Sequence, residues 1–373
     1  MDALMLPLNW QRVRLGDIGK PCMCKRVMKH QTTRYGEIPF YKIGTFGNTA
    51  DAFISKKLFL EYKTKYSFPK KGDILISASG TIGRAVIYDG KPAYFQDSNI
   101  VWIDNDETLV KNDFLFYAYS NVKWNTEHTT ILRLYNDNFR NTLIPLPPLN
   151  EQIAIANILS GLDRYLCALD ALILKKEGVK KALSFELLSQ RKRLKGFNQA
   201  WQRVRLGDVA NYLISNLSAE QITQQGKIKV YDVNNFIGYT DTTFISDKPY
   251  ISIVKDGSVG RVRILPPKTN ILSTMGALIA NHKTTTEFLF YLLSNFDFKN
   301  FISGSIIPHI YFKDYKEKTI FLPPLNEQSA IANILSGLDN EIASLKNKKR
   351  QFENIKKALN HDLMSAKIRV LEK

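Results

Sequence analysis

Residues 146–163 read LPPLNEQIAIANILSGLD, and residues 322–339 read LPPLNEQSAIANILSGLD. The two stretches differ at one of eighteen positions, and the offset between them is 322 − 146 = 176 residues. An earlier pair of segments is identical, since WQRVRLGD stands at residues 10–17 and again at residues 201–208. Segments that return in the same order along a chain indicate duplicated structural units. The sequence therefore predicts two copies of one unit, each of which opens with WQRVRLGD.

Each copy begins with an alternating segment that predicts a strand. Its apolar positions are Val13, Leu15 and Ile18 in the first copy, and Val204, Leu206 and Val209 in the second. A body rich in aromatic residues and glycine follows, in which residues 70–80, KKGDILISASG, predict a strand and a turn. The predicted fold class of the bodies is mixed α/β.

A long helix is predicted after each Leu-Pro-Pro-Leu segment, because proline lacks a backbone N–H and restricts the residue before it. Asn150 and Asn326 are the predicted N-caps, with Glu151 and Glu327 in the first turn, where a carboxylate favours the helix dipole. Apolar residues then recur at intervals of three and four over about five heptads, which is typical of a coiled-coil seam. The first helix is predicted to end at Gly196.

Neither long helix can bury its apolar stripe alone, so we expect the two to pair. Because the second body lies between them in the chain, an antiparallel pair would place one body at each end. The predicted division is a globular domain at 1–149, a helix at 150–195, a globular domain at 196–325 and a helix at 326–373.

The composition is that of a globular chain with an excess of positive charge. The 373 residues include 52 Lys and Arg against 35 Asp and Glu, so the net charge is 52 − 35 = +17, and 44% of residues are hydrophobic. This charge favours a polyanionic partner such as nucleic acid. Much of it lies on the predicted helices, where a solvated face is a sufficient explanation: Lys175, Lys176, Lys180, Lys181, 191–195 and 348–350.

Membrane and export signals are not evident in the sequence. No apolar run reaches the roughly 20 residues of a membrane helix, and the start, MDALMLPLNW, lacks a basic segment followed by an apolar one. Three cysteines do not form a disulfide framework. A cytoplasmic protein with no membrane partner is therefore expected.

Two nearly identical segments in one chain indicate one task performed twice, most simply the binding of two copies of one partner. Identity is concentrated in the opening segments and in the first half of each long helix, whereas the bodies diverge. A recent duplication without functional consequence is the alternative, and it predicts divergence spread evenly along the unit.

The order of body, LPPLNEQ helix, body and LPPLNEQ helix resembles the DNA-specificity subunit of type I restriction-modification systems, over essentially the whole chain. The resemblance implies two target-recognition domains, each of which reads one half of a bipartite double-stranded DNA site, and a helical spacer that sets the gap. It also implies that two adenine methyltransferase (modification) subunits dock on the repeats and that restriction subunits join them. The subunit itself is expected to be non-catalytic, with S-adenosylmethionine, ATP and Mg belonging to its partners. The docking residues expected on the repeats are Asn150, Glu151, Gln152, Asn157, Asn326, Glu327, Gln328 and Asn333.

Side chains that read bases are expected in the divergent bodies, because Arg and Gln make bidentate contacts with guanine and adenine edges. The first body offers a basic stretch with Lys25, Arg26, Lys29, His30, Gln31, Arg34 and Tyr35. The corresponding part of the second body is less basic and offers Gln221, Gln224, Gln225 and Lys227. A solvated loop is the alternative for both.

Two glycine loops are further candidates for DNA contact. They comprise Ser79, Gly80, Thr81, Ile82, Gly83 and Arg84 in the first body, and Gly257, Ser258, Val259, Gly260 and Arg261 in the second. Glycine allows close backbone approach, and hydroxyl, N–H and guanidinium groups bind phosphate. A tight turn that needs glycine for its dihedral angles is the alternative, and both can hold. The segments at 128–139 and 304–315 place Arg133 opposite His309 as a third candidate pair.

Motifs for chemistry are weak. The Leu-Pro-Pro-Leu sites lack the amide or acid and the aromatic residue of an amino-methyltransferase motif, and the sequence has no Gly-x-x-x-x-Gly-Lys-Ser/Thr loop. Asp51, Glu61 and Lys63 resemble the pattern of a metal-dependent nuclease, so a self-contained nuclease is one alternative. A stand-alone DNA-binding regulator is another. No metal site is expected, because the two cysteines near His30 lack a second ligand pair at zinc-finger spacing.

Overall fold

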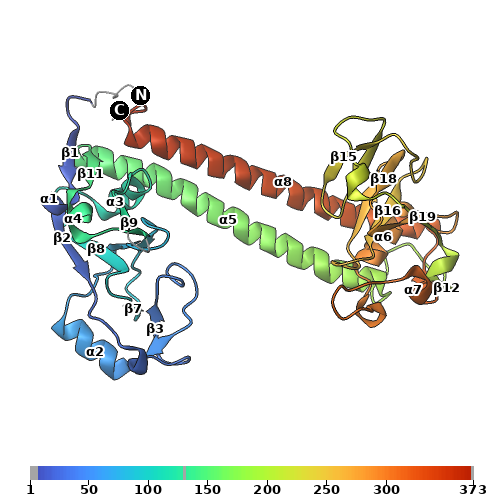
Figure 1. The fold of residues 1–373 in the computed structure, drawn as a ribbon, viewed down its shortest axis with the longest axis horizontal. Coiled ribbons are helices and arrows are strands. Elements are labelled where there is room, and N and C mark those ends of the chain that lie inside the picture. The colour runs from blue at the N-terminus through green and yellow to red at the C-terminus, as the bar shows by residue number, and fades with distance from the viewer. Residues whose placement is uncertain (1–6, 129–131, 371–373) are drawn as a thin grey trace. The chain divides into compact units, whose positions relative to one another are not determined.

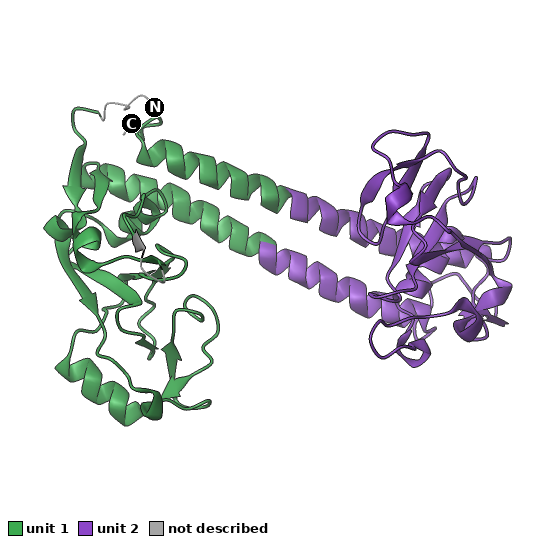
Figure 2. Cartoon of the chain, in the orientation of Figure 1, with its two compact units in different colours: residues 1–169, 348–373 green, residues 170–347 purple. Residues whose placement is uncertain are grey.

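The computed structural model describes residues 7–128 and 132–370. The chain forms two compact units, unit 1 with residues 1–169 and 348–373, and unit 2 with residues 170–347 (Figure 2). Each unit combines strands and short helices with one part of both long helices, so the mixed α/β fold class is confirmed (Figure 1). The boundary between the units crosses both long helices.

The body of unit 1 holds two small sheets. The first has the order β2-β8-β5-β6 with antiparallel neighbours, and the second has the order β4-β3-β7. The strands of the first sheet are β2 (Gly19–Met23), β8 (Ile100–Asn105), β5 (Ile74–Ser77) and β6 (Ala85–Ile87). Those of the second are β4 (Phe53–Ile54), β3 (Ile38–Tyr41) and β7 (Tyr94–Phe95). The strand predicted within 70–80 is confirmed as β5.

Short elements complete this body. The helices are α1 (Leu15–Ile18), α2 (Lys56–Lys65), α3 (Asn112–Tyr119) and α4 (Asn136–Asn141), with a 3-10 turn at Lys29–Gln31. The remaining strands are β1 (Gln11–Arg14), β11 (Leu143–Leu146), β9 (Glu127–His128) and β10 (Leu132–Arg133). The strand β1 pairs antiparallel with β11, with Gln11 opposite Leu146, so the opening segment lies against the strand that leads into the LPPLNEQ segment.

Unit 2 repeats this plan. Its sheets have the orders β13-β19-β16-β17 and β15-β14-β18, and β12 pairs with β20 as β1 pairs with β11. The strands are β12 (Gln202–Arg205), β13 (Ala210–Ile214), β14 (Ile228–Tyr231), β15 (Phe236–Thr240), β16 (Tyr250–Val254), β17 (Val262–Leu265), β18 (Thr269–Ile271), β19 (Met275–Ala280) and β20 (Thr319–Leu322). The helices are α6 (Thr286–Ser294) and α7 (Phe312–Tyr315), with 3-10 turns at Leu206–Asp208, Ala219–Gln221 and Lys299–Phe301.

The opening strand is shorter than predicted. It ends at Arg14, and Leu15 and Ile18 lie buried in the helical turn α1 instead. The cause is Asp17, whose carboxylate accepts the backbone N–H of Arg14 at 3.1 Å and thereby caps the turn. The second copy has the same arrangement, in which Asp208 accepts the N–H of Arg205 at 3.2 Å.

The two long helices are α5 (Leu149–Leu188) and α8 (Leu325–Met364), of 40 residues each. Both begin one residue before the predicted N-caps, because the carbonyl groups of Pro148 and Pro324 already accept the first helical N–H bonds. Asn150 and Asn326 are therefore inside the first turn, although the side chain of Asn326 still accepts the N–H of Glu327 at 2.8 Å.

The helix α5 also ends earlier than predicted, at Leu188 rather than at Gly196. Gln190 takes a left-handed conformation with φ 61°, and the N–H of Lys192 returns to the carbonyl of Glu186. The second copy ends in the same way, with Ala366 at φ 56° and an N–H of Ile368 bonded to Asp362. A left-handed residue after the last turn satisfies terminal carbonyl groups, and here it is not glycine.

Within each unit the parts of the two long helices run antiparallel. In unit 2, Lys176 pairs with Glu341 and Lys180 pairs with Asp339, so the residue numbers rise along one helix as they fall along the other. In unit 1, Tyr165 packs on Phe352 with ring centroids 4.7 Å apart. The seam is best buried where it meets the bodies, since Ile155 and Leu159 join the core of unit 1, and Ile331 and Leu335 join that of unit 2.

Candidate nucleic-acid interface

A basic pocket of about 530 Å³ lies on the body of unit 1 and gathers residues from three distant stretches. Arg26 and Lys29 come from the basic stretch, and Arg133 comes from β10, so the structure brings three predicted DNA-binding residues together. Lys42, Gln96 and Asn99 also line the pocket, and sequence reasoning missed all three. Cations bind phosphate, and the amide and guanidinium groups are those that read base edges. The pocket therefore has the chemistry of a DNA contact.

Gln96 and Asn99 form the amide wall of this pocket, and their positions depend on a strained turn. Ser98, between Asp97 and Asn99, has φ 59°, a conformation that a non-glycine residue adopts rarely. The carboxylate of Asp97 accepts a hydrogen bond from Nε of Arg26 at 2.8 Å, and Oδ1 of Asn99 accepts one from the hydroxyl of Ser79 at 2.7 Å. These bonds tie the turn both to the basic stretch and to the glycine loop.

The glycine loop of unit 1 divides into an accessible part and a packed part. At Gly80 an added Cβ would meet only Ile43, at 3.9 Å, so backbone there is open to a close neighbour. At Gly83, where φ is 81°, an added Cβ would lie 2.1 Å from Nε1 of Trp124. Ser79 forms a β-bridge with Arg133, and Thr81 is exposed. The guanidinium of Arg84 donates to the carbonyl of Phe46 at 2.9 Å and braces the neighbouring loop. The tight-turn interpretation therefore holds at Gly83, whereas the backbone at Gly80 is accessible and its contact with DNA stays a prediction.

The second loop has the same backbone with different side chains. Gly257 faces open space, whereas an added Cβ at Gly260 would lie 2.6 Å from the ring of Phe298. Ser258 and Arg261 are exposed. Asp256 forms a β-bridge with His309, at the positions of Ser79 and Arg133, and its Oδ1 lies 2.6 Å from Nδ1 of His309. The two bodies thus present different chemistry on one frame.

The other predicted DNA-binding residues lie at the surface. His30, Arg34 and Tyr35 are exposed, and Tyr35 is 87% exposed. Lys25 lies over the ring of Tyr66, and the amide of Gln31 caps its own 3-10 turn by accepting the N–H of Met28. In unit 2, exposed side chains follow the 3-10 turn at Ala219–Gln221, at Gln224, Gln225 and Lys227.

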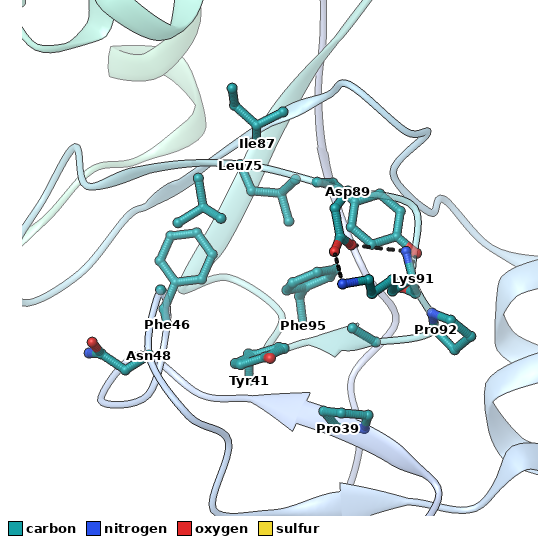
Figure 3. A pocket seen from close by; sticks show the side chains of 14 residues that line it. Pro39, Tyr41, Phe46, Asn48, Leu75, Ile87, Asp89, Lys91, Pro92 and Phe95 are labelled. Carbon is teal, nitrogen blue, oxygen red and sulfur yellow. Dashed lines mark hydrogen bonds and ion pairs between the residues drawn. The ribbon is translucent and has the colours of Figure 1, made fainter. Parts of the chain in front are cut away.

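A second pocket of unit 1, about 430 Å³, has mainly apolar walls (Figure 3). Tyr41 and Phe95 stack with ring centroids 5.9 Å apart, and Phe46 lies beside them. Its charged residues, Asp89 and Lys91, pair with each other at 3.3 Å. Since none of the predicted DNA-binding residues lines it, this pocket is separate from the basic one.

The repeated Glu-Gln pair serves the interior of each unit. Glu151 is 6% exposed, accepts the indole N–H of Trp10 at 3.0 Å, and accepts Nε and Nη2 of Arg369 at 2.7 and 2.9 Å. Gln152 is fully buried and bonds the backbone of Leu109, Lys111 and Pro147.

The second copy repeats these bonds. Glu327 accepts the indole of Trp201 at 3.1 Å and the guanidinium of Arg193 at 2.6 Å. Gln328 is fully buried and bonds the backbone of Lys283, Thr285 and Pro323. A buried side chain with internal partners does not serve as a docking contact, so Glu and Gln of both copies leave the set of predicted docking residues. The predicted residues that remain exposed are Asn150, Asn157, Asn326 and Asn333. The prediction that the charge at 191–195 lies only on a solvated face is wrong for Arg193, because its guanidinium pairs with the buried Glu327.

Comparison with known proteins decides the family. The family described as "Type I restriction modification DNA specificity domain" matches residues 7–176 and 198–354, which is most of the chain and both copies. The chain belongs to the type I restriction-modification DNA specificity family.

Relatives from bacteria and archaea agree with this assignment. A putative type I restriction enzyme specificity subunit of Haemophilus influenzae is 64% identical over 152 residues, 40% of this chain and 40% of that protein. The MjaVIII specificity subunit of Methanocaldococcus jannaschii is 26% identical over 414 residues, covering 99% of this chain and 95% of the relative. The crystal structure of a type I S subunit from M. genitalium has a similar fold, with a TM-score of 0.64 at 20% identity over 97% of this chain and 98% of that one.

Within this specificity-family fold, the three residues of the nuclease alternative have separate partners. Asp51 pairs with Lys42 at 2.8 Å, and Glu61 pairs with Lys65 at 3.1 Å. Lys63 lies over the rings of Phe59 and Phe68. Across residues 7–128 and 132–370, no three His, Cys, Asp or Glu side chains are grouped to hold a metal ion, and no helix has the length and apolar character needed to cross a membrane.

Proposed function

We propose that this chain reads two different half-sites of a bipartite double-stranded DNA target, one with each body, and docks two adenine methyltransferase subunits. The observation that carries the proposal is that two nearly identical exposed helix segments accompany two divergent sites that share one backbone arrangement. Family membership supports the role in DNA specificity. The two half-sites and the two docked subunits are our inference from the repeat.

The reading of two different half-sites rests on the substitutions at one structural position. In unit 1 the buried Ser79 forms a β-bridge with the exposed Arg133, which is one of the four cationic side chains of the basic pocket. Unit 2 presents Asp256 and His309 at the same place. Donors and acceptors that differ select different base edges, so the target is asymmetric rather than palindromic.

The docking of two partners rests on residues that the fold leaves at the surface in both copies. The first ten residues of α5 and α8 expose matching side chains, Leu149, Asn150, Asn157 and Ile158 in one copy and Leu325, Asn326, Asn333 and Ile334 in the other. The exposed position that differs is Ile153 in α5 and Ser329 in α8. Apolar side chains exposed beside amides at two equivalent places are suited to one partner surface used twice.

The remaining functions belong to the partners. S-adenosylmethionine would bind the methyltransferase subunits, while ATP and Mg would serve the restriction subunits of a full cytoplasmic complex. The long helices would set the gap between half-sites, as dimer spacing does in symmetric DNA-binding proteins.

A methyl-transfer assay with purified components tests the proposal. This chain, an adenine methyltransferase subunit of a type I system and S-adenosylmethionine should methylate DNA only when all three are present. Tight specific DNA binding by this chain alone, with no effect on methylation, would favour the stand-alone regulator. Magnesium-dependent cutting by the chain alone, abolished in Glu61→Ala, would favour the nuclease.

A further inference from the structure

The hairpin closed by Ser303 and His309 in unit 2 exposes isoleucine side chains to solvent beside the second glycine loop. Ile306 is 92% exposed and Ile307 is 54% exposed, and Ile302 at the base of the hairpin is 42% exposed. One exposed isoleucine needs no explanation, but three within six residues of one hairpin form an apolar tip. Neither the core nor the helix pair uses these side chains.

The hairpin is held in place by backbone bonds. Ser303 and His309 exchange N–H···O bonds of 2.9 and 2.7 Å, which closes the hairpin around residues 304–308. Gly304 has φ 89°, and an added Cβ there would lie 2.3 Å from the carbonyl oxygen of Ile307, so the turn requires glycine. A rigid tip loses little conformational entropy when it binds.

The apolar tip lies next to the groups proposed to contact DNA. The N–H of Gly257 donates to the carbonyl of Pro308 at 2.9 Å, which joins the hairpin to the glycine loop. Within the hairpin, His309 pairs with Asp256, and exposed Arg261 and Lys299 carry positive charge on adjoining segments. A polyanion bound by these cations would meet the tip.

We propose that the tip of this hairpin, Ile306 with Ile307, contacts the 5-methyl group of a thymine in the half-site read by unit 2. The inference rests on the proposed function. An isoleucine side chain has no hydrogen-bonding group, and the 5-methyl of thymine is the apolar feature that a base pair presents in the major groove. The tip therefore distinguishes A·T pairs from G·C pairs by apolar contact.

The first copy carries a different residue at this place. At the 176-residue offset, Ile306 corresponds to Thr130 and Ile307 to Ile131, and both lie outside the residues that the structure describes. The proposal therefore concerns only the half-site read by unit 2.

Uracil substitution tests this contact in the assembled complex. Duplexes carrying the methylated motif would have each thymine replaced in turn by deoxyuridine, which removes only the 5-methyl group. Binding by the complex should weaken about fourfold at one thymine of one half-site, the effect of losing one buried methyl group. In Ile306→Ala, thymine and uracil duplexes should bind equally. Ile355→Ala, which removes a half-exposed isoleucine from α8, should keep the wild-type difference.

Two results would overturn the inference. One is wild-type binding that is insensitive to uracil at every position. The other is Ile306→Ala weakening thymine and uracil duplexes equally from the wild-type values, which would indicate a wedge between base steps. Failure of the wild-type complex to bind any bipartite motif would instead reject the proposed function on which the inference rests.

Discussion

The indole Nε1 of Trp10 lies 3.0 Å from Oε2 of Glu151, and the same bond joins Trp201 to Glu327 at 3.1 Å. Each bond connects the opening repeat of a copy to the start of its long helix. An arginine from the segment after the other long helix completes each cluster, Arg369 on Glu151 and Arg193 on Glu327. Part of the repeated sequence therefore has a structural role, because it joins the beginning of each copy to its long helix.

The cluster of Trp10, Glu151 and Arg369 is called the clasp of unit 1, and loss of its carboxylate should destabilise that unit. In Glu151→Ala the buried indole N–H of Trp10 loses its acceptor and the partly exposed guanidinium of Arg369 loses its partner, and the unsatisfied indole alone should cost about 1–3 kcal/mol. Urea unfolding followed by tryptophan fluorescence measures this, since Trp10, Trp102 and Trp124 all lie in unit 1. The exposed pair of Glu61 and Lys65 is the control, and Glu61→Ala should cost less than about 0.5 kcal/mol. Equal costs for the two variants would contradict the clasp.

The organisation of the chain follows from its sequence more completely than the site does. The repeats predicted two related units and a helix pair because local periodicity and identity carry that information. The roles of Glu151 and Gln152 were missed, because their partners, such as Arg369 and Lys111, are far away in the sequence. The available signal was that each copy keeps a tryptophan in its WQRVRLGD segment and a glutamate in its LPPLNEQ segment, which indicates a contact between the two segments.

Two further features escaped sequence reasoning for local reasons. The ends of the long helices depend on Gln190 and Ala366 in left-handed conformations, which only their structural context selects. The amide wall of the basic pocket depends on the same kind of conformation at Ser98. No composition rule marks residues 96–99 as a binding wall, because folding alone brings them to Arg26 and Arg133.

The two docking faces should act independently. Placing a charge on the exposed face, in Ile158→Glu or in Ile334→Glu, should lower the number of bound methyltransferase subunits from two to one, and the double variant should bind none. Native mass spectrometry counts the subunits. Ile355→Glu, which alters an exposed isoleucine of α8 outside the repeat, should leave two bound. If either single variant releases both subunits, or if the double variant releases neither, the repeats are not two equivalent docking sites.

The glycines of the second loop should separate folding from binding. Gly260→Ala forces a Cβ against Phe298 at a left-handed residue and should lower the stability of unit 2 by about 2 kcal/mol or more. Gly257→Ala meets no neighbour, so it should cost only about 1 kcal/mol while weakening DNA binding at the open backbone. Thermal unfolding and DNA titration of the complex distinguish the two effects. A Gly257→Ala complex with unchanged DNA affinity would remove this loop from the interface.

The basic pocket should control one half-site alone. Arg133→Ala removes a cation from the wall formed with Asn99 and should relax the methylated motif in the half-site of unit 1, since one bidentate contact is worth about 1–3 kcal/mol of discrimination. Arg12→Ala, an exposed cation of β1 outside the pocket, is the matched control and should leave the motif unchanged. A motif altered in both halves by Arg133→Ala would mean that the bodies do not read separately.

Methylome sequencing of cells with and without this gene tests the central claim most directly. We predict that deletion removes adenine methylation from one bipartite motif with two unlike half-sites, and that every other methylated motif persists. An unchanged methylome, or loss of a single uninterrupted palindrome, would contradict the claim that one chain carries two different readers.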